Sequence, residues 1–346
     1  MISGIDLAER GLAPDTLIRA GIKRLLRDRI KECEGKSVEN SWDLSCRFFD
    51  AMDKAPLALH TPDANTQHYE VPTEFYELCL GGRKKYSSCY FPTGRETLDE
   101  AEEIMLAKTC ERAALQDGQD VLELGCGWGS LSLWMAEKYP KSKITAVSNS
   151  RTQREFIEKV ANAKGFKNLT VITCDMNDFA IDRTFDRVVS VEMFEHMRNW
   201  RLLFQKVSNW LKPDGKLFFH IFVHRFYTYP FETEGDDNWM GRHFFTGGIM
   251  PAFDLPLRFQ EHLKIDSQWL VDGQHYGQTA EWWLKNLDRN RHKALAVFEK
   301  NPRPDGASSV VMLNRWRIFF MACAELWNFE NGREWCVGHY LFSRRK

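Results

Sequence analysis

The middle of the chain alternates short apolar runs with stretches in which apolar residues recur every three or four positions. Short apolar runs predict buried strands, and the three-to-four spacing predicts amphipathic helices. Strands are expected at residues 120–124, 143–148, 169–174, 186–191 and 216–223, with helices between them at residues 129–139, 151–164 and 198–211. This alternation predicts an α/β fold, in which a mostly parallel sheet carries helices on both faces.

Residues 1–60 are predicted to be helical. After Pro14, apolar residues form one face of a helix whose other positions are crowded with Arg and Lys. The apolar face favours packing on the rest of the protein, and the basic face leaves attachment to an anionic lipid surface as the alternative. A further helix is expected from Thr97 to about Leu115, because Thr97 followed by Glu100 forms a capping box.

The C-terminal third begins with a break in the pattern. Residues 225–258 are rich in aromatic residues, Gly, Pro and acids and follow neither period. A long irregular segment before a final strand is often a lid or a substrate wall. Helices that could close a pocket are expected at residues 278–300 and 309–329, and the last strand at residues 335–343.

The first predicted strand ends in a Gly-rich turn. Residues 120–129 read DVLELGCGWG, with Glu123 two positions before the first glycine. Without a Cβ, such a turn lets the backbone come close to a ligand, and the following helix offers unpaired N–H groups to an anion. The G-x-G-x-G spacing lacks the tail of the dinucleotide motif. Together with Glu123 it resembles the nucleotide-binding motif of S-adenosylmethionine (SAM) methyltransferases.

Ligands of parallel α/β sheets bind beyond the carboxyl ends of the strands, so four loops should share one rim. The loops are residues 125–129, 148–150, 175–176 and 192–196. We expect Glu123 to orient the turn or to contact the amino-acid part of the cofactor. Amide and hydroxyl groups should meet the ribose, and an acid with a neighbouring Met should meet adenine. The residues in these roles are Ser148, Asn149, Gln153, Asp175 and Met176.

The candidate for catalysis is the segment VVSVEMFEHMRNW. A buried strand at residues 188–191 is followed at once by Glu192, Glu195 and His196. Two carboxylates and an imidazole crowded at the end of a core strand shift each other's pKa values, which suits general acid–base work. Histidine titrates near neutral pH and can take a proton from an acceptor ammonium or hydroxyl group.

Composition limits the function. The formal net charge of −1 supplies no field that favours nucleic acid. The nine cysteines show no CxxC pair or zinc spacing, so we expect reduced thiols, no metal site and a cytoplasmic protein. No run reaches the roughly 20 apolar residues that span a bilayer, so no stable membrane insertion is expected. Aromatic residues make up 13% of the chain, which suits a large core or a pocket for a flat or cationic ligand.

Several segments carry a resemblance to a known family: HYEVPTEFYELCLGG, KYSSCYF, TLDEAEE, LELGCGWGSLSLWMAEKYP, SNSRTQREFI, VEMFEHMRNW and HFFTGGIMP. They resemble the plant alkaloid N-methyltransferases of the coclaurine and tetrahydroprotoberberine group. This group belongs with the cyclopropane-fatty-acid synthases to one SAM-dependent superfamily. The resemblance runs from about Leu12 to the end and implies a Rossmann-like class I methyltransferase. We therefore expect an N-terminal helical cap over residues 1–115, which contributes to both sites. A core over residues 116–346 should follow, with a substrate lid at about 225–330.

The resemblance also implies roles by position. Tyr86 and Ser87 would contact SAM from the N-terminal segment, and Gly125 and Gly127 would hold its methionine part. Asn149 and Gln153 would lie near the ribose and methionine, with Asp175 and Met176 at adenine. Glu195 and His196 fall on the catalytic Glu-His pair of the N-methyltransferases, and Glu192 falls on an additional acid found in part of the group. Apart from the resemblance, the aromatic residues offer candidates for the substrate wall, at least half of which are expected to belong to the ordinary core: Tyr90, Phe91, Trp239, Phe244, Phe245, Trp316, Phe320 and Trp327.

These roles predict a mechanism. An aliphatic amine has a pKa of roughly 10.4, so at neutral pH it is mostly protonated and cannot attack a methyl group. We hypothesise that Glu195 and His196 bind the ammonium and accept its proton, directly or through water. Glu192 would add negative potential for a cationic acceptor. The expected partner is a small-molecule amine, with a homodimer left open.

Two rival interpretations remain. Cyclopropane synthases hold a bicarbonate base with a Cys, a Glu, a His and a Tyr, and Glu195, His220 and Tyr276 stand at three of these positions. The Cys position is Ser88 here, with Cys89 one place along, which argues against bicarbonate and against methyl or methylene transfer to an unsaturated lipid. The second rival is a non-catalytic SAM-binding or lipid-surface protein that uses the basic N-terminal helix.

Overall fold

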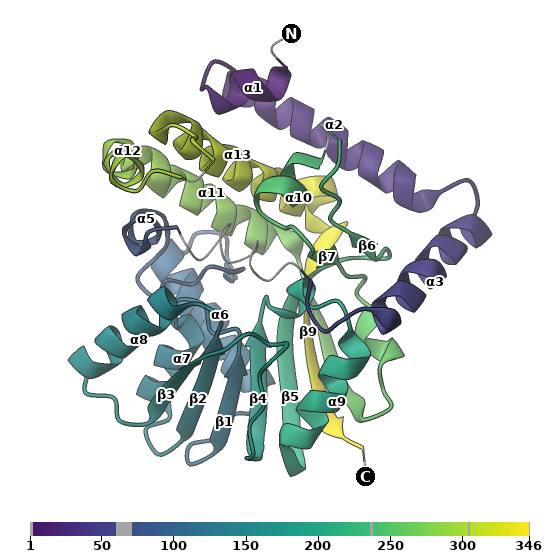
Figure 1. Cartoon of the computed structure of the whole chain (residues 1–346), viewed down its shortest axis with the longest axis vertical. Helices are drawn as coiled ribbons and strands as arrows, with labels where there is room; N and C mark the ends of the chain where they lie inside the picture. The colour runs from purple at the N-terminus through teal and green to yellow at the C-terminus, as the bar shows by residue number, and fades with distance from the viewer. Residues whose placement is uncertain (1–2, 60–70, 236–237, 304, 346) are drawn as a thin grey trace.

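A mixed seven-stranded sheet, ordered β3-β2-β1-β4-β5-β9-β8, forms the centre of the molecule (Figure 1). The computed structural model describes residues 3–59, 71–235, 238–303 and 305–345. Five neighbouring strands run parallel, β9 runs antiparallel to them, and β8, which pairs antiparallel with β9, forms the edge. The five parallel neighbours are β1 (Asp120–Leu124), β2 (Lys143–Ser148), β3 (Leu169–Thr173), β4 (Phe185–Val191) and β5 (Leu211–His224), and the last two strands are β9 (Trp335–Arg344) and β8 (Leu263–Val271). The predicted α/β fold is confirmed.

Helices cover both faces of the sheet because successive strand residues point to opposite sides. On β1, Val121 packs in a cluster with residues of α6 and α7, and Leu122 packs in a cluster with residues of α9. One face carries α6 (Leu98–Arg112), α7 (Ser130–Lys138) and α8 (Arg151–Ala163), and the other carries α9 (Trp200–Trp210), on which α3 (Val38–Lys54) packs. The capping box at the start of α6 is formed as predicted, with Thr97 and Glu100 exchanging hydrogen bonds.

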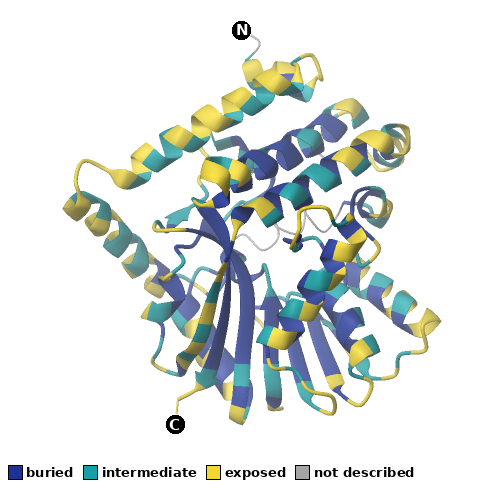
Figure 2. Cartoon of the chain, turned by 180° about the vertical axis from the view of Figure 1, so that it is seen from behind, coloured by how far each residue is buried: buried dark blue, intermediate teal, exposed yellow. Residues whose placement is uncertain are grey.

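A third layer of helices lies above the sheet in Figure 1. Its centre is the pair α11 (Gly273–Arg289) and α13 (Ser309–Asn328), whose buried residues include several Trp and Phe. Figure 2 shows buried stretches on the helices of this layer. The layer consists of α1 (Gly4–Glu9), α2 (Asp15–Glu34), α5 (Thr73–Cys79), α11 (Gly273–Arg289), α12 (Arg291–Lys300) and α13 (Ser309–Asn328). Residues from both ends of the chain therefore close the sheet from above.

The segment after β5 joins the sheet to this layer. It contains α10 (Trp239–His243) and a small hairpin-like pair, β6 (Tyr229–Pro230) and β7 (Ile249–Met250). A short 3-10 turn at Leu255–Arg258 ends this segment, and two further 3-10 turns lie elsewhere in the chain, at Phe194–His196 after β4 and at Phe329–Gly332 after α13. The predicted irregular insertion is thus mostly loop, held by a few short elements.

Two features of the C-terminal third correct the sequence-based prediction. Strand β8 was not expected, although LKIDSQWLV places Leu263, Ile265 and Trp269 at alternate positions of an edge strand. The helix predicted at residues 278–300 begins five residues earlier and is divided at Asn290, where α11 ends and α12 begins. The few polar residues around Asn290 were too short a segment to predict that the helix breaks there.

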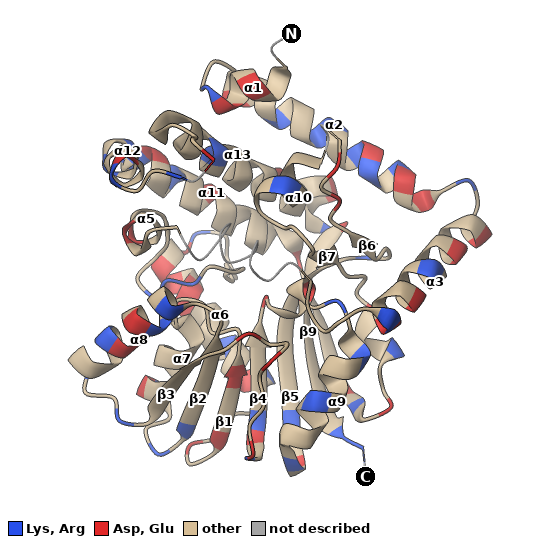
Figure 3. Ribbon diagram, viewed as in Figure 1, with Lys and Arg blue, Asp and Glu red and all other residues tan. Residues whose placement is uncertain are grey.

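The basic helix α2 packs on the helical layer through its apolar face. Ile18, Ile22 and Leu26 are partly buried against the upper core, and Arg19 forms ion pairs with Glu281 on α11 and Glu325 on α13. Figure 3 shows that acidic positions alternate with basic ones along α2 and α3. Packing on the protein, the first of the two interpretations of this helix, agrees with these contacts. Among the described residues, every helix is too short or too polar to cross a bilayer.

Candidate active site

A cavity opens at the carboxyl ends of β1 to β4, between the sheet and the helical layer. Its floor is the Gly-rich turn, in which Gly125, Gly127 and Gly129 have φ values of +77°, +51° and +77°. Only glycine adopts such angles without strain. A Cβ on Gly127 would meet nothing within 4 Å, whereas one on Gly125 would lie 2.6 Å from the side chain of Met193. The turn therefore leaves space for a ligand and touches the segment that carries the candidate catalytic residues.

Glu123 lies under this turn with its side chain almost fully buried. Its Oε2 accepts a hydrogen bond from the Ser132 hydroxyl at the start of α7, and the residue lines the cavity. Burial raises the pKa of Glu123 to about 8. A carboxylate kept in such surroundings favours a cationic partner, because a positive charge would offset the loss of solvation.

The next two strand ends supply the polar groups expected there. Ser148 donates to Gln153 Oε1 at 2.6 Å, so strand β2 and helix α8 fix this amide at the cavity wall beside Asn149. Asp175 Oδ1 accepts the backbone N–H of Asn177 at 2.8 Å, and Met176 is almost fully buried next to it. All of these side chains except that of Asn177 belong to residues that line the cavity.

The segment that carries Tyr86 and Ser87 is anchored on α6 by a buried acid that the sequence analysis did not single out. Glu102 accepts the backbone N–H groups of Gly81, Arg83 and Lys85 at 3.0, 2.7 and 3.2 Å. Burial raises the pKa of Glu102 to about 7, although these donors oppose the shift. The anchor brings the two predicted SAM contacts to the cavity wall. A mid-helix Glu at a buried position of α6 was the only signal for it.

Lys85 was also missed. It is 2% exposed, and its ammonium group donates to the Ser87 hydroxyl and to the Ser88 carbonyl oxygen, 2.7 Å away. Burial lowers the pKa of Lys85, and the nearby Glu192 and Glu102 carboxylates counteract the shift. A lysine next to a predicted binding pair has no feature in sequence that marks it as buried.

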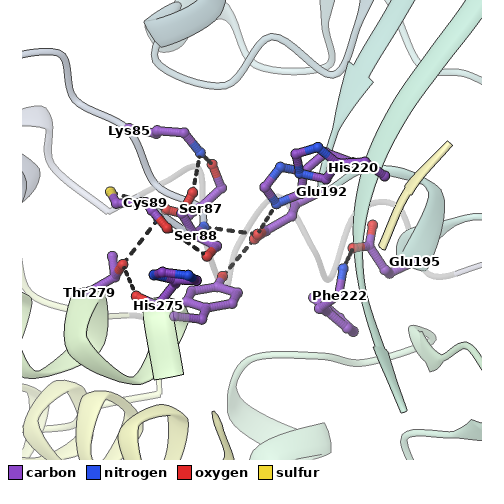
Figure 4. Close-up of polar contacts among 12 residues, drawn as sticks. Lys85, Ser87, Ser88, Cys89, Glu192, Glu195, His220, Phe222, His275 and Thr279 are labelled. Atoms are coloured by element: carbon purple, nitrogen blue, oxygen red, sulfur yellow. Dashed lines mark hydrogen bonds and ion pairs between the residues drawn. The ribbon is translucent and has the colours of Figure 1, made fainter. Parts of the chain in front are cut away.

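Among the described acids that line the cavity, Glu192 has the largest number of hydrogen-bond contacts (Figure 4). Its Oε1 accepts the backbone N–H of Ser88 at 3.0 Å and lies 3.2 Å from His220 Nε2, and its Oε2 accepts the Tyr276 hydroxyl at 2.6 Å. Burial raises the pKa of Glu192, and Lys85 and these hydrogen bonds oppose the rise. Its φ of +49°, unusual for a residue with a Cβ, turns the chain out of β4 at this point.

Glu195 and His196 follow on the 3-10 turn and face different ways. The His196 ring lines the cavity and stacks on Phe245, with ring centroids 5.7 Å apart and planes 6° apart. Glu195 does not line the cavity: its Oε1 accepts the Phe222 N–H at 2.8 Å (Figure 4). Its Oε2 is buried without a hydrogen-bond partner among the described residues, and burial raises the pKa of Glu195 well above the ordinary range.

The aromatic wall differs from the expected one. The described lining contains Tyr86, Trp128, Phe222, Phe245, Tyr276, Trp283 and Phe319, of which Phe245 alone was a predicted wall residue. The other predicted residues form the layer behind this wall. Phe244 stacks on Phe319, Trp327 stacks on Tyr276, and the Trp239 indole donates to Glu9. The remaining four, which also lie outside the lining, are Tyr90, Phe91, Trp316 and Phe320. Adjacent helix residues point about 100° apart, so composition alone could not separate Phe319 from Phe320.

The cavity fits SAM. The glycine turn leaves an open approach for the backbone, and Glu123, Gln153, Asp175 and Met176 supply acidic, amide and apolar groups at the successive strand ends. These are the groups that an amino acid cation, a ribose and an adenine require. All of the residues predicted to contact the cofactor lie together at this rim.

Comparison with known proteins agrees with this picture. The family model described as mycolic acid cyclopropane synthetase matches residues 59–334. The (S)-coclaurine N-methyltransferase of Thalictrum flavum subsp. glaucum is 34% identical over 339 residues, which cover 97% of this chain and 94% of that protein. The (S)-tetrahydroprotoberberine N-methyltransferase of Eschscholzia californica is 35% identical over 341 residues, with coverage of 93% and 97%.

Solved structures give the same result. A crystal structure of coclaurine N-methyltransferase bound to N-methylheliamine and S-adenosylhomocysteine superimposes with a TM-score of 0.93. It is 35% identical and covers 98% of both chains. The cyclopropane synthase CmaA1 shares the fold, with a TM-score of 0.68 at 22% identity. The chain therefore belongs to the mycolic acid cyclopropane synthetase family, in its group of SAM-dependent alkaloid-type N-methyltransferases.

Proposed function

We propose that the protein methylates the amine nitrogen of an aromatic alkaloid or arylalkylamine of the benzylisoquinoline type. The observation that carries the proposal is the placement of His196 and Glu192 on one cavity wall, with the Phe245 ring stacked on the imidazole. Acids attract an ammonium group, and aromatic faces bind both a cation and a flat ring system. The relatives named for coclaurine and tetrahydroprotoberberine act on amines of this class.

The chain's own residues prepare the amine for attack. SAM, when bound, supplies a methyl group that is electrophilic at carbon. The acceptor arrives as an ammonium ion, and its proton must leave before the nitrogen lone pair can form the new C–N bond. Glu195 and His196 are assigned to this step, and burial raises the pKa of Glu195, so a proton on its carboxyl group is held more tightly than on an exposed glutamate. His196, which lines the cavity, binds the ammonium and accepts its proton on a ring nitrogen, directly or through water.

Glu192 holds a fixed negative charge next to the acceptor. Three donors converge on its two oxygens, from Ser88, His220 and Tyr276. Two of these side chains, His220 and Tyr276, stand at positions that hold bicarbonate in the synthase branch. Here both bind a carboxylate of the chain itself, which leaves no donors of theirs for an external anion. This arrangement favours amine methylation without bicarbonate over transfer to a lipid alkene.

The proposal is tested with SAM labelled on its methyl group. The acceptor panel contains a benzylisoquinoline secondary amine, a tertiary tetrahydroprotoberberine, a simple phenethylamine and vesicles of an unsaturated phosphatidylethanolamine, each with and without added bicarbonate. We expect label in at least one aromatic amine and a rate that bicarbonate does not change. Label only in the phospholipid, or turnover that requires bicarbonate, would contradict the proposal.

A further inference from the structure

A file of buried or partly buried polar side chains, formed by Arg112, His339, His220 and Glu192, runs from the C-terminal end of α6 to the active-site acid. Arg112, the last residue of α6, lies with its Nη1 2.9 Å from Nδ1 of His339 on β9. His339 is directly opposite His220 on β5, and the two ring centroids are 4.6 Å apart. His220 in turn contacts Glu192. Both histidines are fully buried, and in the chemistry proposed above His220 only donates to Glu192, whereas His339 has no part.

The protons of this file can be assigned from its ends. A guanidinium group only donates hydrogen bonds, so His339 Nδ1 must be an acceptor and the ring proton must sit on Nε2. Burial lowers the pKa of both His339 and His220 well below the ordinary range, so each ring is neutral and carries one proton. The carboxylate of Glu192 only accepts, so His220 carries its proton on Nε2 and has a lone pair on Nδ1.

The two nitrogens left over are complementary. His339 Nε2 and His220 Nδ1 are both buried without a hydrogen-bond partner among the described residues. By the assignment above, the first carries a proton and the second a lone pair. On neighbouring cross-strand rings this combination of donor and acceptor is favourable, and a change of tautomer in one ring alone would place two lone pairs or two protons against each other.

We propose that Arg112 and His339 are positioning residues of the methyl-transfer site, which order the protons of the buried histidine pair so that His220 presents an N–H to Glu192. The file runs in one direction, from the Arg112 cation through His339 and His220 to the acid. It keeps Glu192 ionised and its carboxylate fixed at the cavity wall. This inference rests on the proposed function, since Glu192 matters to catalysis only if it faces a cationic acceptor.

Other groups also act on Glu192 and must be held constant in a test. They come from every element packed on it: Lys85 and Cys89 on the segment after α5, Glu195 and His196 on the 3-10 turn, Tyr276 on α11 and Cys323 on α13, while Glu102 on α6 acts on Lys85. Lys108 of α6 also lies near His339. None of these residues contacts Arg112 in a hydrogen bond that the structure records, so Arg112 can be changed without altering them directly.

The kinetic test is the pH dependence of kcat/KM for the amine in Arg112→Met, Arg112→Lys and wild type. Without the Arg112 donor the protonated form of Glu192 is favoured. In Arg112→Met the acidic limb of the kcat/KM profile should therefore shift to higher pH by about one unit. Arg112→Lys retains a cationic donor and should restore most of the shift. SAM affinity should stay unchanged in both.

Two control variants separate this effect from damage to the fold. Arg187→Met removes an arginine that binds the Ala113 and Ala114 carbonyl oxygens at the end of the same helix without touching His339. Trp269→Leu removes the ring on which Arg112 stacks, with its guanidinium carbon 5.0 Å from the ring centroid. Both should keep the wild-type pH profile. The same shift in either control, or a wild-type profile in Arg112→Met, would overturn the proposal.

A measurement on the unmodified enzyme covers the case in which Arg112→Met fails to fold. Long-range proton–nitrogen NMR on histidine-labelled protein distinguishes the two neutral tautomers. We expect His339 and His220 to remain neutral with the proton on Nε2 from about pH 6 to about pH 8. A proton on Nδ1 of His339 would overturn the proposal. The NMR result does not depend on the acceptor, so it stands or falls separately from amine methylation.

Discussion

The cofactor side and the amine side of the cavity are built in different ways. The cofactor side is built mainly from consecutive strand ends of one βαβ series, to which the segment before α6 adds Tyr86 and Ser87, and every residue predicted there lines the cavity. The amine side draws on distant segments, which meet only after the helical layer has folded over the sheet. Among the predicted wall residues, Phe245 alone lines it. A local motif can thus be located from sequence, whereas a wall that depends on tertiary packing cannot.

The largest change in activity is expected from a substitution of His196, which should affect the amine side of the cavity and leave the cofactor side unchanged. His196→Ala removes an imidazole that lines the cavity but leaves the glycine turn intact. Turnover should fall by about 10²–10⁴-fold, the usual range for loss of a general base, while the dissociation constant for SAM barely changes. Calorimetric titration with SAM and single-turnover rates measure the two quantities. His292→Ala, at an exposed position on α12, serves as a control. Equal losses in both quantities would mean that His196 supports the whole cavity.

A smaller effect is expected at Glu123. Glu123→Gln keeps the shape of the side chain but removes its charge, so SAM should bind about tenfold more weakly if the carboxylate meets a cationic group. Without SAM the variant should be more stable at alkaline pH. Between pH 4.5 and about 8 the folded protein keeps a proton on Glu123 that the unfolded chain has released, so wild type loses unfolding free energy as pH rises.

The amide in Glu123→Gln does not titrate, so this loss of unfolding free energy is absent from the variant. At pH 8 its unfolding free energy should therefore exceed that of wild type by about 3–5 kcal/mol, and near pH 4.5 the two should agree. Denaturant unfolding of the SAM-free proteins at both pH values checks this. A constant difference across the range would show that packing, not charge burial, separates the two proteins.

The smallest expected effect distinguishes the wall from the layer behind it. Phe245→Ala should raise KM for the amine about five- to tenfold, because it removes the ring beside His196 that a cation would face. Trp239→Phe removes the indole N–H that binds Glu9 but leaves an aromatic ring, and KM should change less than twofold. If Trp239→Phe had the larger effect, Trp239 would belong to the substrate wall after all.

The sequence predicts most of the sheet and the cofactor rim because both follow short-range rules. Alternating apolar runs locate β1 to β5, and the turn at Gly125 must be glycine for steric reasons. The rest depends on contacts between residues far apart in the chain. Glu102 and Lys85 reach the site because the buried face of α6 packs on the segment after α5, where Glu102 accepts the Lys85 backbone N–H. Strand β8 was predictable in principle from its alternation, but it lies at an edge where the pattern is weak.

The close approach between Gly125 and Met193 has a consequence for how new acceptor specificities arise. A side chain at position 125 would collide with Met193, which follows Glu192 directly. Substitutions that reshape the turn after β4 are therefore constrained by the cofactor loop, whatever acceptor they would admit. Phe245 and Thr246, on the segment after α10, are free of this constraint. In directed evolution toward other amines, beneficial changes should accumulate on that segment first, and Met193 should remain unchanged through many rounds of selection.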